Sequence, residues 1–255
     1  MKTLAIIGSN GMLGSDLVRY LSASFDLTPI NKENYHTFIG KKFDIIIDAN
    51  GNSRRFWANQ NPVEDFSAST FSVVKSIFDF PNDLYIYISS ADVYEDHTNP
   101  EKTKESQEIN PQKLSSYGFH KYLSELIIKK HQKRFLILRF PLLLGRNIKK
   151  GPFYDITHNV PLFVTLKTKL QLITTHAAAK IIETLLKNSV ENDTINVGGK
   201  GSFVFTKLAR YFGKEIQVSN DAETQTYEMN TEKIKRLYPD LKTSEEYLQE
   251  FIKGI

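Results

Sequence analysis

Short apolar runs, separated by longer mixed segments, recur along the first part of the chain. Five of them are expected to be strands, at 3–8, 25–30, 43–49, 84–90 and 134–140. Their centres are aliphatic or aromatic without polar alternation, which is typical of strands buried on both faces of a parallel sheet. Amphipathic patterns between them predict helices at 11–24, 62–80 and 116–132. This alternation predicts an α/β fold with a doubly wound parallel sheet.

The pattern changes after about residue 146, where "GRNIKKGPFYD" indicates a loop that leaves the sheet. Further helices are expected near 176–188, 203–213 and 243–253. We therefore expect a sheet domain over 1–146, to which later segments return, and a reduced C-terminal lobe over 147–255. The connection at 31–42 is short for a full α/β unit. Either it crosses compactly to the next strand, or the strand at 25–30 is displaced.

Composition narrows the function classes. The 255 residues fit about one large domain or one domain with a small lobe. The formal charge of +4 comes from scattered lysines, which argues against a nucleic-acid partner. The absence of cysteine excludes disulfides and thiolate metal sites, and the six histidines lack metal-ligand spacing, so no metal is expected. No apolar run is long enough for a membrane span, and a cytoplasmic protein is expected.

Three glycines follow the first predicted strand in "GSNGMLG", at Gly8, Gly11 and Gly14. A strand, a glycine turn and a helix in this order are typical of a dinucleotide-binding loop. Gly8 permits a tight turn, Gly11 lets backbone N–H groups approach a pyrophosphate, and Gly14 lets the helix pack closely. The alternative is that these are ordinary turn glycines.

Two further motifs carry acid/base chemistry. Tyr117 and Lys121 are four residues apart on a predicted helix, so they share one face. A neighbouring ammonium lowers the pKa of a phenol, which makes tyrosine a usable acid or base. Ser89 and Ser90 end a predicted central strand, where a hydroxyl faces the ligand crevice of such sheets. The alternatives are a surface Tyr–Lys pair and a serine that caps a turn.

Together these motifs resemble the extended short-chain dehydrogenase/reductase family of nucleotide-sugar epimerases, dehydratases and ketoreductases. "GSNGMLG", "SSADVY", "YGFHK" and "LRFPLLLG" are similar to the family's motifs in order and spacing, and the resemblance covers essentially the whole chain. It implies a Rossmann-type domain with a small substrate lobe. It also implies a two-fold dimer built on the helix at 117–131, with Phe66, Phe71 and Phe78 either in the core or at that interface.

The resemblance assigns roles to individual residues. It implies that Tyr117 is the general acid/base, that Lys121 holds the nicotinamide ribose, and that Ser90 hydrogen-bonds the substrate oxygen. Further cofactor contacts are implied for Gly8, Ser9, Asn10, Gly11, Met12, Leu13, Gly14, Asn50, Gly51, Phe140 and Pro141.

The chain departs from the family pattern at Ser69, Glu95, Leu142, Leu143, His176 and Ala177. Dehydratases of the family often carry a carboxylate at the position of Asp92, preceded by an aspartate, but here Ala91 precedes it. Asp92 is therefore either an additional acid/base or a turn residue. "GNSRRFW" places Trp57 after two arginines, which suggests either contacts with a nucleotide or packing.

The end of the second strand bears on the choice of cofactor. NAD-selective enzymes place an acidic residue there, which binds the ribose hydroxyls. Asp26 lies at the start of this strand instead, and its end is followed by Asn31 and Lys32, which favours NADP. Glu33 is the alternative ribose ligand and would favour NAD.

The combined hypothesis is an NAD(P)H-dependent ketoreductase that acts on a nucleoside-diphosphate sugar. The alternatives are an NAD-dependent epimerase or dehydratase and, in another class, a non-catalytic NADP-binding sensor or structural subunit. A sensor has no need of Ser90, Tyr117 and Lys121 together, and this chain has all three.

Overall fold

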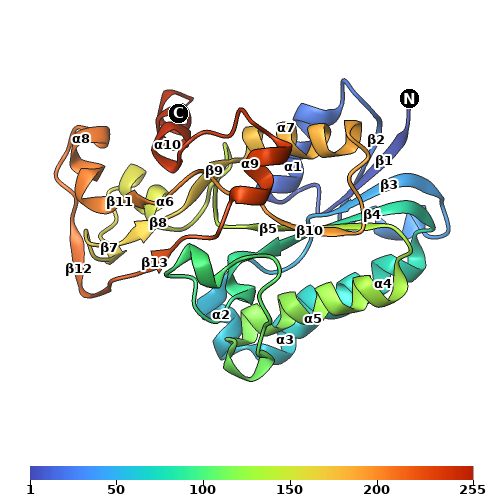
Figure 1. The fold of residues 1–255 in the computed structure, drawn as a ribbon, viewed down its shortest axis with the longest axis horizontal. Helices are drawn as coiled ribbons and strands as arrows, with labels where there is room; N and C mark the ends of the chain where they lie inside the picture. The colour runs from blue at the N-terminus through green and yellow to red at the C-terminus, as the bar shows by residue number, and fades with distance from the viewer. Residues whose placement is uncertain (255) are drawn as a thin grey trace.

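Six parallel strands form the central sheet of the computed structural model, which describes residues 1–254 (Figure 1). The five predicted strands are confirmed, and a sixth from the C-terminal half joins them. The strands are β1 (Thr3–Ile7), β2 (Asp26–Ile30), β3 (Phe43–Asp48), β4 (Asn82–Ser90), β5 (Phe135–Phe140) and β10 (Asp193–Asn196), in the order β10-β5-β4-β3-β1-β2. Because β1 pairs with both β2 and β3, the chain order reverses there, and ligands of such sheets bind at that point.

The short connection between β2 and β3 crosses compactly, and β2 is not displaced. It contains one 3-10 turn, η1 (Tyr35–Phe38), instead of a full helix. The hydroxyl of Tyr35 donates to Asp79 at 2.9 Å, which ties this turn to the end of a helix below the sheet. The crossing brings β3 to the far edge of β1 and completes the crevice.

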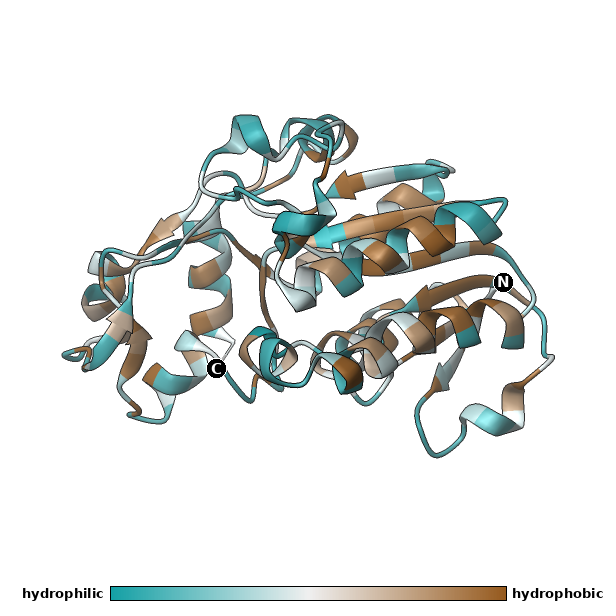
Figure 2. Cartoon of the chain, turned by 90° about the horizontal axis from the view of Figure 1, so that it is seen from below, coloured by the Kyte–Doolittle hydropathy of each residue, from teal (hydrophilic) through white to brown (hydrophobic). Residues whose placement is uncertain are grey.

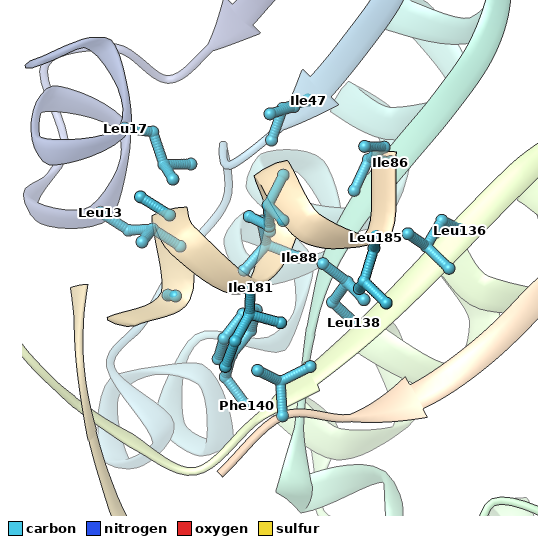
Figure 3. Packing of buried hydrophobic residues seen from close by; sticks show 14 of the residues in the cluster. Leu13, Leu17, Ile47, Ile86, Ile88, Leu136, Leu138, Phe140, Ile181 and Leu185 are labelled. Atoms are coloured by element: carbon cyan, nitrogen blue, oxygen red, sulfur yellow. The ribbon is translucent and has the colours of Figure 1, made fainter. Parts of the chain in front are cut away.

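Two pairs of helices cover the sheet, one pair on each face (Figure 1). α1 (Met12–Leu21) and α7 (Thr175–Lys187) cover one face, and α4 (Ser72–Asp79) and α5 (Ser116–His131) cover the other. Leu17, Ile181 and Leu185 point from the first pair onto Ile47, Ile86 and Leu138 of the strands (Figure 3). Hydrophobic residues concentrate on the strands and the helix sides that meet them, whereas the connecting loops are mostly hydrophilic (Figure 2).

The helix predicted at 62–80 is divided. α3 (Pro62–Phe66) is followed by a π-helical turn, η2 (Ser67–Phe71), before α4 begins. Such turns are frequent at functional sites. This one buries Ser69 and Thr70. A further helix, α2 (Arg55–Gln60), precedes α3, and short 3-10 turns follow β4 at η3 (Ala91–Val93), η4 (Pro100–Lys102) and η5 (Pro111–Lys113).

The C-terminal elements outside the central sheet form a second assembly with its own apolar core around Phe153, Phe203 and Phe205. We call it the C-terminal lobe; it lies at the end of the molecule remote from β2 (Figure 1). It comprises α6 (Pro152–Thr157), β7 (Leu162–Val164), β8 (Lys169–Leu170), β11 (Phe203–Val204), η6 (Phe205–Lys207), α8 (Leu208–Phe212), β12 (Val218–Glu223), β13 (Thr226–Tyr227) and α10 (Ser244–Lys253). Only the second half of the helix predicted at 203–213 is α-helical.

Three elements connect the two parts. β6 (Leu142–Leu144) pairs with β9 (Leu172–Thr174), and α9 (Glu232–Leu237) packs beside β10. α7 and β10 come from the C-terminal half of the chain, and they pack on and extend the central sheet. Among residues 1–254, no helix combines the length and apolarity that a membrane crossing requires.

Candidate active site

The glycine loop lies between β1 and α1, at the crevice. The N–H groups of Gly8 and Ser9 donate to the carbonyl of Ile30 at 2.9 and 3.1 Å, which anchors the loop to the end of β2. Gly8 has φ +82°, and a Cβ there would lie 2.8 Å from the backbone N of Asn50. A Cβ on Gly14 would lie 2.1 Å from the carbonyl oxygen of Gly8. Both glycines are therefore required by close backbone packing.

Gly11 has a different role. A Cβ on it would meet only the carbonyl oxygen of Gly8, at 3.2 Å, so the space above it is not filled by the chain. Gly11 is the N-cap of α1, where free N–H groups and the helix dipole favour an anion. Beside it, the hydroxyl of Ser9 is buried without a hydrogen-bond partner in residues 1–254. An open cradle and an unpaired hydroxyl fit the pyrophosphate of a dinucleotide.

Substituting Gly11 with Val should weaken NADPH binding at least about tenfold, about 1.4 kcal/mol. Its φ of −72° tolerates a side chain, so the fold should survive, but the branched group would occupy the cradle. Calorimetric titration of the folded variant measures this. Gly14→Val is the comparison variant. Its valine side chain would clash with the Gly8 backbone, so this substitution should lower the melting temperature of the protein. An unchanged affinity in Gly11→Val would show that the cradle does not hold the cofactor.

The other residues of the loop divide between core and site. Leu13 is buried in the sheet core, so only its backbone is available to a cofactor. Met12 lies against Gly145, where a Cβ would come within 2.8 Å of its side chain. The Asn10 side chain donates to Glu33 at 3.4 Å. The side-chain oxygen of Asn31 accepts from the N–H groups of Glu33 and Asn34, at 2.9 and 3.1 Å, and is thereby held in a turn.

Asn50 and Gly51 follow β3 on the other side of the crevice. A Cβ on Gly51 would lie 3.6 Å from both the Nζ of Lys121 and the Oγ of Ser69. Ser69 stands where the family commonly has asparagine, so a polar group is retained beside this loop. Beneath it, Asp48 accepts from the Asn50 N–H at 3.0 Å. Burial raises the pKa of Asp48. The hydrogen bonds that Asp48 accepts, including the one from Asn50, partly offset this rise.

Ser90, Tyr117 and Lys121 meet at the carboxyl end of β4. Ser90 is the last residue of β4, and Tyr117 and Lys121 lie in the first turns of α5, all with less than a tenth of their surface exposed. Gly118 makes this approach possible, because a Cβ there would lie 2.1 Å from the carbonyl oxygen of Asp92. Sequence reasoning did not single out Gly118, although it directly follows Tyr117 in the motif.

Electrostatics differ from the expectation that Lys121 lowers the pKa of Tyr117. Burial raises the pKa of Tyr117, and Asp92 raises it further. Interaction with the Ser90 hydroxyl opposes this rise. The Nζ of Lys121 instead donates to the carbonyl of Ile88 at 2.9 Å. Burial also lowers the pKa of Lys121 to about 8. Desolvation is therefore the largest influence on both groups, and it favours the neutral form of each side chain.

Asp92 is occupied by hydrogen bonds. It accepts from the Ser90 hydroxyl at 2.8 Å and from Tyr227 at 3.3 Å, and it forms an ion pair with Arg55 at 2.8 Å. Arg55 is the first residue of α2 and one of the two arginines in "GNSRRFW", so one arginine of this segment contacts Asp92. Trp57 is half-buried in α2. Phe140 is buried at the end of β5, opposite Ser90, and Pro141 follows it.

A buried ion pair supports this edge of the sheet, and sequence reasoning missed it. Arg139 of β5 donates to Glu125 of α5 at 2.9 and 2.6 Å and to the hydroxyl of Tyr94 at 2.8 Å. Ser89 also donates to Glu125, at 2.6 Å. A charged residue inside an otherwise apolar strand, "RFLILRF", is the signal that could have found it.

The remaining departures from the family pattern serve packing or the surface. His176 packs against Tyr20 with ring centroids 4.7 Å apart and ring planes tilted by 40°, and Ala177 lies in the core. Glu95 pairs with Lys113, and Leu142 and Leu143 form β6. Within the described part of the chain, no group of three or more His, Asp or Glu side chains is arranged to hold a metal ion.

Known structures share this fold over nearly their whole length. dTDP-4-dehydrorhamnose reductase from Bacillus anthracis, solved with NADP, covers 100% of this chain and 98% of its own, at 18% identity and TM-score 0.80. The same enzyme from Clostridium acetobutylicum matches at 17% identity over 99% of both chains, with TM-score 0.79. UDP-N-acetylglucosamine 4-epimerase from Methanobrevibacter ruminantium matches at 16% identity over 99% and 97%, with TM-score 0.79. At these identities, the likeness concerns the fold alone.

Sequence comparison identifies the family. No curated protein sequence matches the chain. The model of the NAD dependent epimerase/dehydratase family matches residues 4–198, which include the glycine loop, Ser90, Tyr117 and Lys121. The chain therefore belongs to the NAD dependent epimerase/dehydratase family and is an NAD(P)-dependent oxidoreductase of the extended short-chain dehydrogenase/reductase type.

Proposed function

We propose that the protein is an NAD(P)H-dependent ketoreductase that acts on a nucleoside-diphosphate sugar. The observation that carries the proposal is the meeting of Ser90, Tyr117 and Lys121 beside the glycine loop. In this proposal Tyr117 supplies the proton that reduction of a ketone requires.

In this proposal each residue has one task. The dinucleotide lies along Gly8–Gly14 and Gly51, and Lys121 holds its nicotinamide ribose. When bound, it supplies the hydride for the keto carbon. Tyr117 gives its phenolic proton to the carbonyl oxygen as that oxygen gains charge, and Ser90 donates a hydrogen bond to the same atom. The product is the corresponding alcohol, and solvent returns the proton to Tyr117.

The contacts of Asp92 favour reduction over dehydration. A dehydratase needs an additional acid and base at this turn. Here Ala91 has no acidic group, and both oxygens of Asp92 already accept hydrogen bonds from Ser90, Arg55 and Tyr227. This turn therefore carries a single carboxylate, paired with Arg55 at 2.8 Å, where a dehydratase needs both an additional acid and a base.

The test is to incubate the protein with NADPH or NADH and a panel of nucleoside-diphosphate keto sugars, beginning with dTDP-4-dehydrorhamnose. A reductase consumes the reduced cofactor in proportion to the sugar alcohol formed. An epimerase or dehydratase converts a nucleotide sugar without net consumption of cofactor. That second result, or tight cofactor binding with no conversion of any sugar, would contradict the proposal.

We expect a modest preference for NADPH over NADH. Lys32 is exposed with no ion pair in the described residues, and it can face a 2′-phosphate, whereas Glu33 beside Asn10 opposes that charge. An exposed pair contributes only about 1 kcal/mol, or several-fold. Lys32→Ala should weaken NADPH selectively, and Glu33→Gln should strengthen it, as measured by titration with both cofactors. A wild-type preference for NADH, or equal losses for both cofactors in Lys32→Ala, would assign the ribose to Glu33.

We also propose that residues 147–255, apart from the segments that rejoin the sheet, form the substrate lobe. Gln225 and Tyr227 of this lobe contact the Arg55–Asp92 pair beside Ser90, at 3.4 and 3.3 Å, so the lobe reaches the catalytic residues. A nucleotide bound by the lobe would thus place its sugar next to Tyr117.

A second copy of the chain is the proposed partner. Phe66, Phe71 and Phe78 are not in the core: they are 42%, 54% and 66% exposed, together with Phe119 and Leu126 of α5. These exposed apolar side chains come from α3, η2, α4 and α5, which pack against one another. Large exposed apolar patches on soluble proteins mark interaction sites.

Phe78→Glu should shift the protein from dimer to monomer, because the interface would have to bury an unpaired carboxylate. Sedimentation equilibrium of the wild type and the variant measures this. Phe163→Glu is the matched control, since Phe163 is equally exposed at 66% but lies in the C-terminal lobe. A monomeric wild type, or dissociation by both substitutions, would contradict the proposed interface.

A further inference from the structure

We propose that Arg55 is a positioning residue: by neutralising Asp92 it frees the Ser90 hydroxyl to donate its hydrogen bond to the substrate oxygen. The proposal rests on the proposed reduction, in which Ser90 acts on that oxygen. No hydrogen bond joins Arg55 to Tyr117 in the described residues, so Arg55 acts through its ion pair with Asp92 and through the nearby positive charge that it brings to Tyr117.

Ser90 has a single hydroxyl hydrogen, and two acceptors compete for it. In this structure the hydrogen is donated to Asp92, at 2.8 Å between oxygens, while the N–H of Asp92 donates back to the Ser90 oxygen at 3.2 Å. A hydroxyl that donates to Asp92 cannot donate to substrate at the same time. The strength with which Asp92 holds this hydrogen therefore decides how readily Ser90 turns toward the substrate.

The other partners of Asp92 weaken that hold. Arg55 pairs with Oδ1 at 2.8 Å, and the pair is shielded, with side-chain exposures of 35% for Arg55 and 13% for Asp92. The Tyr227 hydroxyl donates to the same oxygen at 3.3 Å. A carboxylate whose charge is balanced by a guanidinium is a weaker acceptor for Ser90 than a bare carboxylate in the same enclosed place.

A stack of side chains fixes Arg55 in this position. Its guanidinium lies 4.7 Å from the centre of the Tyr227 ring, and His97 stacks on Tyr227 at 3.7 Å between centroids. Gln225 accepts from Arg55 at 3.4 Å. Arg55 belongs to the sheet domain, whereas Gln225 and Tyr227 belong to the C-terminal lobe. Contacts from both parts of the chain therefore hold Arg55 beside Asp92.

The electrostatics of Tyr117 point in the same direction. After burial, the largest contribution that raises its pKa is the charge of Asp92; Asp65 also raises it, while Ser90 and Arg55 oppose the rise. Loss of Arg55 would leave Asp92 unbalanced, hold Ser90 more firmly, and make Tyr117 a weaker proton donor. Each of these changes slows the proton transfer without touching the cofactor loop.

The experiment compares kcat, KM and NADPH affinity of the holoenzyme for Arg55→Met, Arg55→Lys and the double variant Arg55→Met/Asp92→Asn. Arg55→Met should lower kcat at least about tenfold, since full removal of a donor to a developing oxyanion costs about 10²–10³-fold. NADPH affinity should stay unchanged. Arg55→Lys should retain most of kcat, and Asp92→Asn should restore much of it to Arg55→Met. The matched control is Arg134→Met, which breaks the surface pair with Glu191 at the other end of β5.

A readout without substrate keeps this test separate from the proposed reaction. The ¹³Cζ resonance of Tyr117, assigned by its loss in Tyr117→Phe, should move in Arg55→Met, return toward its wild-type position in the double variant, and stay in place in Arg134→Met. If the wild type reduces no keto sugar, the proposed function is wrong. The Tyr117 resonance can still be measured in that case, and it still shows whether Arg55 affects the surroundings of Tyr117. A resonance that does not move, or a double variant no faster than Arg55→Met, would overturn the role of Arg55.

Discussion

Replacing Tyr117 with Phe should lower kcat by about 10²–10⁴-fold, the range that general acid/base catalysis typically contributes. The substitution removes the phenolic proton that reduction requires and leaves the buried ring in place. NADPH affinity should change little, because the glycine loop, Gly51 and Lys121 are untouched. Steady-state turnover of the keto sugar and calorimetric titration of NADPH measure the two effects separately.

Tyr122→Phe is the matched control for this substitution. Tyr122 lies in the same helix and packs against the small cluster of Ala91, Val93, Tyr94 and Met229, without a side-chain hydrogen bond in the described residues. Tyr122→Phe also removes one hydroxyl, and it should leave kcat close to the wild-type value. If Tyr117→Phe and Tyr122→Phe have similar kcat values, Tyr117 is not the proton donor.

Replacing Arg139 with Met should lower the free energy of unfolding by about 3–5 kcal/mol, as expected when one partner of a buried ion pair is removed. Glu125 is fully buried, and the substitution would leave its charge uncompensated. The hydroxyl of Tyr94 would lose its donor from Arg139, although it keeps its bond to Asn196 at 2.8 Å. Urea denaturation of the wild type and variant measures the difference.

Two comparisons decide whether burial is the cause. Arg134→Met breaks the exposed pair with Glu191 and should cost about 0–1 kcal/mol. Arg139→Met/Glu125→Gln removes both charges and should recover part of the lost stability. Equal costs for Arg134→Met and Arg139→Met would show that the buried pair has no special importance.

Most of the sheet was predictable because β1, β3, β4 and β5 have apolar centres that are buried on both faces. All five predicted strands lie within about two residues of their observed ends, including the more exposed edge strand β2. The sixth strand, β10, has only four residues and was not predicted. The short segment at 31–42 was correctly recognised as unusual, but its compact crossing depends on the partner that β3 finds. β3 pairs with β1 and β4, and these long-range pairings cannot be predicted from the local sequence pattern.

The C-terminal lobe was much less predictable. Its strands have as few as two residues, as in β8 and β13, and they pair with segments far away in the chain. Such pieces have no periodicity of their own. The helix expected at 203–213 begins instead with β11, because Phe203 and Phe205 are drawn into the lobe core.

The motif residues of the site could be listed from the sequence, but not the contacts that set their chemistry. The spacing of Tyr117 and Lys121 correctly placed both on one helix face. It could not show that burial raises the pKa of Tyr117, or that Arg55 reaches Asp92 across the crevice. These effects come from segments tens of residues apart that meet only in the folded protein.

The most direct test of the proposed reduction is to follow the hydrogen itself. The protein is given NADPH carrying deuterium at the transferable position of the nicotinamide, together with a nucleoside-diphosphate keto sugar, and the product is analysed by mass spectrometry. The proposed function predicts one deuterium on the former carbonyl carbon and one oxidised cofactor for each product molecule. An unlabelled sugar product, formed while the deuterium remains in the cofactor, would contradict it.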